Sequence, residues 1–184
     1  MIIIINPALL TIHTTIRCTL TFFFVVVVES QDIKSWFLKR ASSLTIAGAT
    51  TADLQRLEKT IDIELPSSLK FMLLDSNGGL WYMEKEFMSC SSIAQVIGKF
   101  EGRKSWRSGV VPLCGDEGMG MLVVDTTTAK VAVYEWDEDD GIAVDPLFPS
   151  LASFLEGYRN LLLAGQCEFL DECGVVEKVS KSRK

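Results

Sequence analysis

Residues 109–137 read GVVPLCGDEGMGMLVVDTTTAKVAVYEWD, and this stretch decides the fold class. It contains three short segments rich in β-branched residues, at 109–114, 121–125 and 131–136, and turn-forming residues separate them. Short β-prone segments joined by such turns are typical of an antiparallel meander. We therefore expect consecutive antiparallel strands here, with a further short edge strand at 141–145.

Helical patterns lie on both sides of these strands. Apolar residues recur there at three- and four-residue intervals, and Thr50 and Pro66 suit the start of a helix. The pattern predicts helices at 31–43, 50–62, 66–77, 92–100 and 151–165, a strand at 80–83, and a further short helix at 167–179. Helices, then strands, then a helix predict an α+β fold rather than an alternating α/β sheet.

The first 28 residues differ from the rest, because they are mostly apolar and Arg17 is their only charge. Their insertion into a bilayer would be favourable by roughly a few kcal/mol. However, the charge-free run after Arg17 covers only residues 18–28, whereas a span needs about 20 apolar residues. Three readings stay open for residues 1–28: a membrane anchor with the domain on the cytoplasmic side, a non-native extension, and an apolar arm packed against the domain. We place the domain at 29–165 and a C-terminal extension with a basic tail at 166–184.

The composition narrows the range of functions. A net charge of −6 argues against nucleic acid as a partner. The only histidine, His13, lies in the apolar N-terminal segment, so the domain holds none to act as a general base. The five cysteines form no Cys-x-x-Cys pair, which favours reduced thiols and a cytoplasmic protein. We expect Cys114 to be buried and unreactive, and we expect no metal or other cofactor.

Carboxylates gather in the second half of the chain. Between Ser108 and Tyr158 there are ten acidic residues and one basic residue, Lys130. Their spacing is not that of an EF-hand loop, and the glycine-rich stretch 115–120 joins two strands, which is the wrong context for a phosphate loop. We interpret the cluster either as a solvated turn or as a surface for a basic segment of another protein. The residues of the predicted surface are Asp116, Glu117, Trp136, Asp137, Glu138, Asp139 and Asp140.

Several ordered motifs resemble those of a known family. The motifs are Gly48-Ala49-Thr50, Leu65-Pro66, Asn77-Gly78-Gly79, Val111-Pro112-Leu113, Tyr134-Glu135-Trp136-Asp137 and Ser153-Phe154-Leu155. In this order and spacing they are similar to the SUKH superfamily, which includes the yeast cell-wall assembly regulator of the Smi/Knr type. The resemblance covers residues 47–165. It implies N-terminal helices, a curved antiparallel sheet and a closing C-terminal helix, in a domain that binds proteins and carries no common catalytic residues.

The combined expectation is a non-enzymatic protein-binding module that acts as a regulator, an adaptor or an immunity-like protein. Two alternatives are open. A small carboxylate- or metal-dependent hydrolase would need a deep pocket holding at least two of Asp116, Glu117, Asp125 and Asp137. A membrane-tethered adaptor would use residues 1–28 to set its location.

Overall fold

The computed structural model describes residues 25–41, 44–116, 118, 120–128, 130–171 and 173–178. The predictions of an anchor, an extension or a packed arm within residues 1–24, and of a basic tail at 179–184, lie outside the described residues. Within the part that is described, no helix combines the length and the apolar character needed to cross a bilayer.

Helices dominate the first half of the domain. Residues 25–40 are helical, and the following helices are α2 (Thr51–Ile61), α3 (Ser67–Asp75) and α4 (Cys90–Phe100). A reciprocal capping box starts α2, because the main-chain N–H of Asp53 donates to Thr50 Oγ1 and that of Thr50 donates to Asp53 Oδ2. The helix predicted at 92–100 begins about one turn earlier than expected: Ser89 caps α4, and the main-chain N–H of Ser92 donates to Ser89 Oγ at 3.1 Å.

In the part of the chain that the structure describes, four antiparallel strands form the central sheet, in the order β3-β4-β5-β6, so the predicted meander is confirmed. Their bounds are Val110–Asp116 for β3, Gly120–Asp125 for β4, Val133–Asp137 for β5 and Gly141–Ile142 for β6. The register shifts between Pro112 and Cys114, and such a bulge bends its strand. The sheet is therefore curved, and it stays open.

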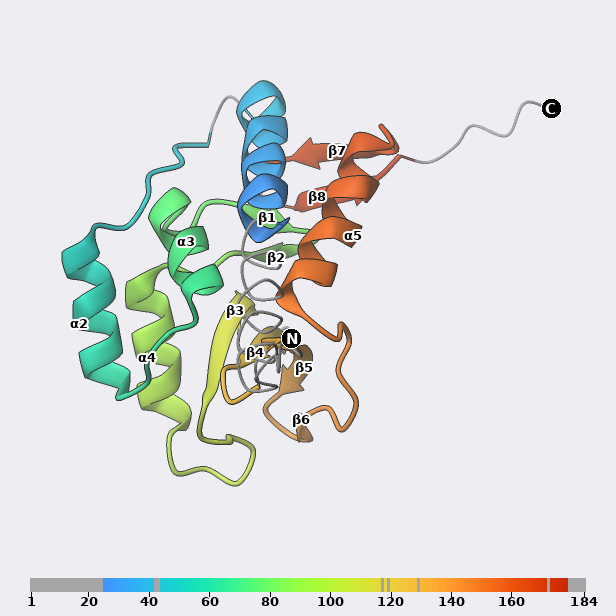
Figure 1. Ribbon diagram of the computed structural model, residues 1–184. Coiled ribbons are helices and arrows are strands. Elements are labelled where there is room, and N and C mark those ends of the chain that lie inside the picture. The colour runs from blue at the N-terminus through green and yellow to red at the C-terminus, as the bar shows by residue number, and fades with distance from the viewer. Residues whose placement is uncertain are drawn as a thin grey trace, which may run out of the picture.

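A second pair of short strands, β1 (Trp81–Tyr82) and β2 (Lys85–Glu86), leads into this sheet. An isolated bridge joins Phe87 to Cys114 of β3. Helices α2 and α4 lie side by side on one side of the central sheet, and α5 (Leu151–Leu163) lies on the other (Figure 1).

The closing helix α5 is confirmed. Ser150 and Ser153 form its capping box, and its buried face includes Phe154, Leu155 and Tyr158. The hydroxyl of Tyr158 donates to the main-chain oxygen of Trp81 at 2.7 Å, which ties α5 to β1.

The short helix predicted at 167–179 was wrong, since an antiparallel hairpin of β7 (Cys167–Leu170) and β8 (Gly174–Glu177) stands there. Cys167 and Val175 are fully buried, and the main-chain N–H of Val175 donates to the oxygen of Met83 at 2.9 Å. Pairing with the β1–β2 hairpin satisfies main-chain groups that a helix would have satisfied internally. Tertiary packing therefore decided the structure of this segment.

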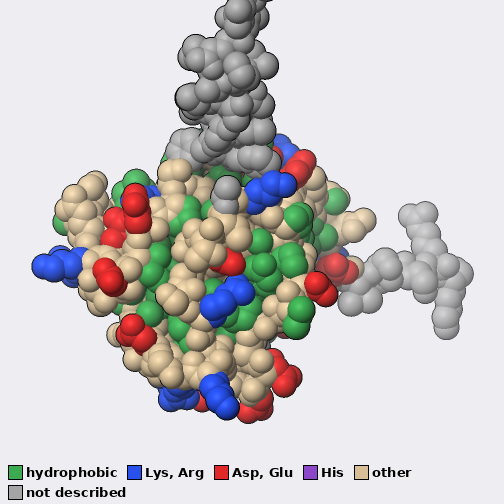
Figure 2. Space-filling model, turned by 60° about the horizontal axis from the view of Figure 1, so that its bottom comes forward, with side chains coloured by type: hydrophobic (Ala, Val, Ile, Leu, Met, Phe, Trp, Pro, Cys, Tyr) green, Lys and Arg blue, Asp and Glu red, His purple; other side chains and the backbone are tan. Residues whose placement is uncertain are grey.

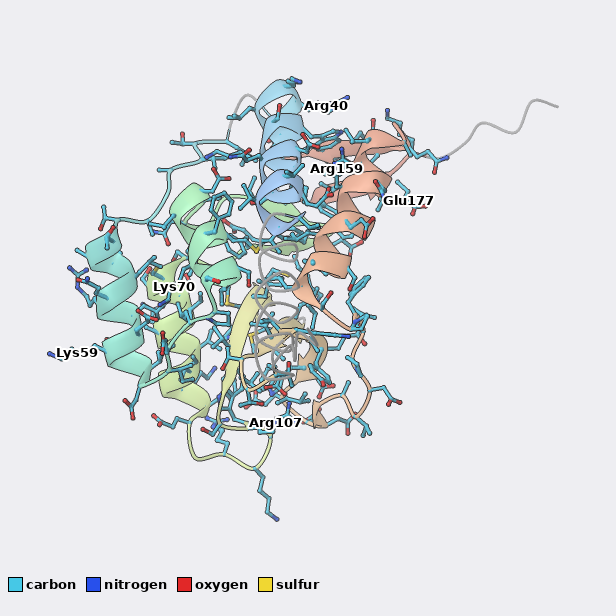
Figure 3. All side chains as sticks on the ribbon, viewed as in Figure 1. Arg40, Lys59, Lys70, Arg107, Arg159 and Glu177 are labelled. Atoms are coloured by element: carbon cyan, nitrogen blue, oxygen red, sulfur yellow. The ribbon has the colours of Figure 1, made fainter. Side chains whose placement is uncertain are left out.

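The helix of residues 25–40 crosses the boundary that we placed at residue 28. Its residue Phe37 is buried and lies 5.7 Å, ring to ring, from Phe169 of β7. Arg159 of α5 forms ion pairs with Glu29 at 2.9 Å and Asp32 at 2.6 Å, and Figure 3 shows it between the two helices. This helix and the C-terminal hairpin thus pack on each other as well as on the domain core.

Candidate functional site

Residues 137–140, the last residue of β5 and the connection to β6, are named the acidic turn, and two features fix their conformation. Oδ1 of Asp137 accepts hydrogen bonds from the main-chain N–H groups of Asp139 at 2.9 Å and Asp140 at 2.7 Å. Gly141 follows with a φ of +77°, and a Cβ there would lie 3.0 Å from the main-chain oxygen of Ser105. Because L side chains rarely adopt this φ, glycine is the residue that suits the position.

The remaining carboxylates of the acidic turn face solvent. Glu138, Asp139 and Asp140 are all exposed. Glu138 forms an ion pair with Arg103 at 2.7 Å, and both side chains are about half exposed, so the pair contributes little to stability. Among the described residues, no lysine or arginine forms an ion pair with Asp139 or Asp140. These two carboxylates remain available to a cation from outside the domain.

Trp136 does not belong to the exposed surface, and its predicted role as a partner contact needs correction. The side chain is only 2% exposed, and its ring lies 4.6 Å from Phe100 and 5.6 Å from Trp106. Its Nε1–H donates to the main-chain oxygen of Ser105 at 2.9 Å. The large apolar ring is buried because it fills the space between α4 and β5, and its role is to tie the acidic turn to the loop of residues 101–109.

This loop places Arg103 next to the acidic turn, a contact that the sequence patterns did not predict. Arg103, Lys104 and Arg107 are exposed there, and Arg107 lies at the lower end of the molecule in Figure 3. Arg107 pairs with Asp125 at 2.9 Å and lies over the ring of Tyr134 at 5.7 Å. Arg103 and Glu138 are 35 residues apart in the chain, so local sequence gave no signal of their contact.

The carboxylates predicted for a catalytic pocket are not all brought together. Asp116 of β3 pairs with Gly120 of β4, and the next residue of β4 pairs with Trp136 of β5. The main chain of Asp116 therefore lies at the same end of the sheet as the acidic turn. The two are separated by two strand spacings, roughly 10 Å. The side chain of Asp116 and the whole of Glu117 lie outside the described residues. Asp125 lies at the opposite end of β4.

Asp125 is committed to structural contacts. It is 5% exposed, and besides Arg107 it accepts hydrogen bonds from the main-chain N–H and the hydroxyl of Thr127, at 2.9 and 2.6 Å. Asp125 and Asp137 therefore share no pocket. Within the described ranges, no group of three histidine, cysteine, aspartate or glutamate residues is arranged to hold a metal ion.

Cys114 is buried, as predicted. Its side chain is fully enclosed, and burial raises the pKa of the thiol to about 12, although the nearby charge of Lys85 acts in the opposite direction. A thiol with this pKa is protonated at neutral pH and is a poor nucleophile.

A cleft of about 500 Å³ between α4 and β2 was not found by sequence reasoning. Glu86, Gln95 and Lys99 supply polar groups to it, and Glu86 Oε1 accepts a hydrogen bond from the main-chain N–H of Gly79 at 3.3 Å. Its described lining contains no cysteine or histidine, and the hydroxyls of its serines, Ser89 and Ser92, hydrogen-bond to each other at 2.9 Å. The cleft is large enough to hold a small ligand or a side chain.

The arrangement of helices and strands is the α+β arrangement that the resemblance to the SUKH superfamily implied. Within it, the model of the SMI1 / KNR4 family (SUKH-1) matches residues 48–157, which is more than half of the chain, and the chain belongs to this family. The family is generally one of non-enzymatic regulatory and immunity proteins. No curated protein matches the sequence. The helix of residues 25–40 and the hairpin β7–β8 lie outside the matched range.

Proposed function

We propose that the chain is a non-enzymatic protein-binding module, acting in the cytoplasm as a regulator, an adaptor or an immunity-like protein, and that its acidic turn binds a basic segment of a partner protein. One observation carries the proposal: Asp139 and Asp140 are exposed, on a turn held in place by Asp137 and Gly141, and no ion pair with a described residue neutralises them.

The fixed geometry favours binding. A turn that already holds its conformation loses little conformational entropy when a partner docks. Exposed charges of this kind speed association and select a partner of opposite charge, and each contributes a modest amount to affinity. The interaction is therefore expected to weaken as the salt concentration rises.

The chemistry of the described residues agrees with a binding role. Cys114 is protonated and enclosed, and Asp125 is bound to Arg107 and Thr127. The family to which the chain belongs is generally non-enzymatic. A catalytic role would need a reactive group that these residues do not supply.

The test compares two variants of the full chain with the same change in net charge. Asp139→Lys/Asp140→Lys alters the acidic turn, whereas Glu168→Lys/Glu177→Lys alters two exposed residues of the C-terminal hairpin. Glu177 lies far from Arg107 and the lower end of the molecule in Figure 3. The probe is a fluorescent "glycine peptide" whose lysines are separated by glycines, and anisotropy reports its binding.

We expect the turn variant to bind the glycine peptide at least about tenfold more weakly than the wild type, because two attractive pairs become repulsive, a loss of about 1.4 kcal/mol or more. The hairpin variant should lose much less. Equal losses in both variants would show that only the overall charge matters, and the proposed role of the acidic turn would then be wrong.

A further inference from the structure

An exposed apolar loop follows the acidic turn along the chain. It consists of residues 144–147, Val-Asp-Pro-Leu, and is named the apolar loop here. Val144 is 96% exposed and Leu147 is 46% exposed. Single exposed apolar side chains are common on protein surfaces, but two within four residues, one of them almost fully exposed, form a small apolar patch.

The structure holds the apolar loop out in solvent. On one side of it, the main-chain N–H of Ala143 donates to the oxygen of Glu135 at 2.9 Å. On the other side, Phe148 and Val133 exchange two main-chain hydrogen bonds, at 3.0 and 3.1 Å. The two anchor points are two residues apart on β5 but five residues apart on the loop side, so the intervening residues must project away from the sheet.

The C-terminal anchor is itself fixed in the core. The ring of Phe148 lies 5.3 Å from that of Phe154 on α5, in an edge-to-face arrangement. While this contact and the two hydrogen bonds to Val133 are in place, Leu147 next to Phe148 cannot withdraw far from the surface. The apolar loop is therefore displayed as a preorganised element.

Carboxylates stand on both sides of Val144. The acidic turn precedes it by way of the two-residue strand β6, and Asp145 follows it directly; Asp145 is also exposed. Figure 2, which turns the lower part of Figure 1 toward the viewer, shows apolar side chains gathered in the middle of this face, with acidic and basic side chains around them. Exposed carboxylates before and after an exposed apolar side chain define the chemistry of what can dock there.

We propose that the apolar loop and the acidic turn form one docking surface, and that its occupant is a partner protein segment in which an apolar side chain is flanked by lysine or arginine. A second copy of this chain would bring its own carboxylates against those of the acidic turn, and like charges oppose that contact. An anionic lipid headgroup would be repelled in the same way. This inference rests on the proposed function, because the acidic turn supplies the charge complementarity.

The experiment uses the full chain and two peptides of equal length and charge. The first is the glycine peptide, and the second, the "leucine peptide", replaces its central glycines by leucine. The variant Val144→Ser/Leu147→Ser removes the apolar groups of the loop, and the matched control Leu38→Ser/Leu163→Ser removes two leucines that are 59% and 55% exposed elsewhere. Circular dichroism melts establish that each variant folds.

We expect wild-type protein to bind the leucine peptide about tenfold more tightly than the glycine peptide, which corresponds to burying roughly one aliphatic side chain. V144S/L147S should abolish that preference while binding the glycine peptide as the wild type does, and L38S/L163S should keep the preference. If V144S/L147S fails to fold, Val144→Thr, which has nearly the same shape, replaces it and should reduce the preference.

Two results would overturn the inference. If the wild type bound both peptides with equal affinity, the apolar loop would have no part in binding. The proposed function would still stand if Asp139→Lys/Asp140→Lys bound the glycine peptide more weakly than the wild type does. A concentration-dependent dimer that V144S/L147S dissociates, measured by sedimentation, would show that the loop serves self-association. Loss of any dependence on the acidic turn would instead refute the proposed function itself.

Discussion

Replacing Trp136 by phenylalanine tests how the acidic turn is attached to the domain. The indole Nε1–H of Trp136 donates to the oxygen of Ser105 at 2.9 Å, and the ring packs edge-on against Phe100 at 4.6 Å. Phenylalanine keeps an aromatic ring at the site but removes the N–H donor and part of the ring volume. The variant therefore leaves the oxygen of Ser105 without this partner. It also opens a small void in the interior, because the side chain of Trp136 is only 2% exposed.

The expected loss of stability follows from these two changes. Because the hydrogen bond to Ser105 is only partly buried, its loss costs about 0.5–1.5 kcal/mol. The void adds about 1 kcal/mol, a fraction of the 3–5 kcal/mol that complete truncation of a buried tryptophan costs. The free energy of unfolding should therefore fall by about 1.5–2.5 kcal/mol, and for a chain of this length the melting temperature should fall by about 3–10 °C.

Urea denaturation followed by far-ultraviolet circular dichroism measures this loss. The matched control is Trp81→Phe, because Trp81 is only partly buried and contributes its main-chain oxygen, which the substitution keeps, to the bond from Tyr158. The control should lose clearly less stability than W136F. A decrease of less than about 0.5 kcal/mol in W136F, the range typical of surface substitutions, would refute the idea that Trp136 anchors the turn.

Two further predictions concern ionisable groups. Burial alone would raise the pKa of Glu58, but its hydrogen bonds from Lys70 and from the main-chain N–H of Leu65, both 2.8 Å long, outweigh burial and lower the pKa. A lowered pKa in the folded state stabilises the protein above the unfolded pKa, and this stabilisation is lost as the pH falls through the folded pKa. Glu58→Gln should thus reduce the unfolding free energy by about 1 kcal/mol at pH 7, and the difference from wild type, measured by urea denaturation, should shrink toward pH 3. In native protein, iodoacetamide should modify the exposed Cys173 and spare Cys114, whose pKa burial raises to about 12, as mass spectrometry can report.

Each of these predictions has a control. Lys70→Met removes the other partner of the ion pair, and its stability should depend on pH less than that of the wild type between pH 7 and pH 3. A stability difference for E58Q that stays constant over this range would contradict the assignment. Cysteine labelling is done in a Cys18→Ser background, since Cys18 lies outside the described residues. Rapid labelling of Cys114 before unfolding would show that β3 opens in the native state.

The elements that sequence patterns predicted correctly are those specified by local signals. β-branched runs separated by turn residues specified the meander from β3 to β5, and the serine that precedes Leu151 marked the start of α5. Main-chain geometry and neighbouring side chains determine such features, so a single sequence contains them.

The errors arose where distant contacts decided the structure. The apolar residues of the C-terminal segment, 167–179, fit both the helical period of 3.6 residues and the strand period of two. The segment forms a hairpin because its main chain pairs with the β1–β2 hairpin through Met83. Trp136 was placed on the binding surface because its neighbours are acidic, whereas Phe100 and Ser105, more than thirty residues earlier, enclose it. The contact of Arg103 with the acidic turn was missed for the same reason.

The central claim is that the acidic turn and the apolar loop together receive a basic partner segment. The most direct test is a titration of ¹⁵N-labelled full chain with the leucine peptide, followed by nuclear magnetic resonance. We predict that the largest shifts of the amide signals fall within residues 135–147 and include Val144. Shifts confined to the cleft between α4 and β2, at Gln95 and Lys99, would contradict the claim, as would the absence of any shift in the range 135–147.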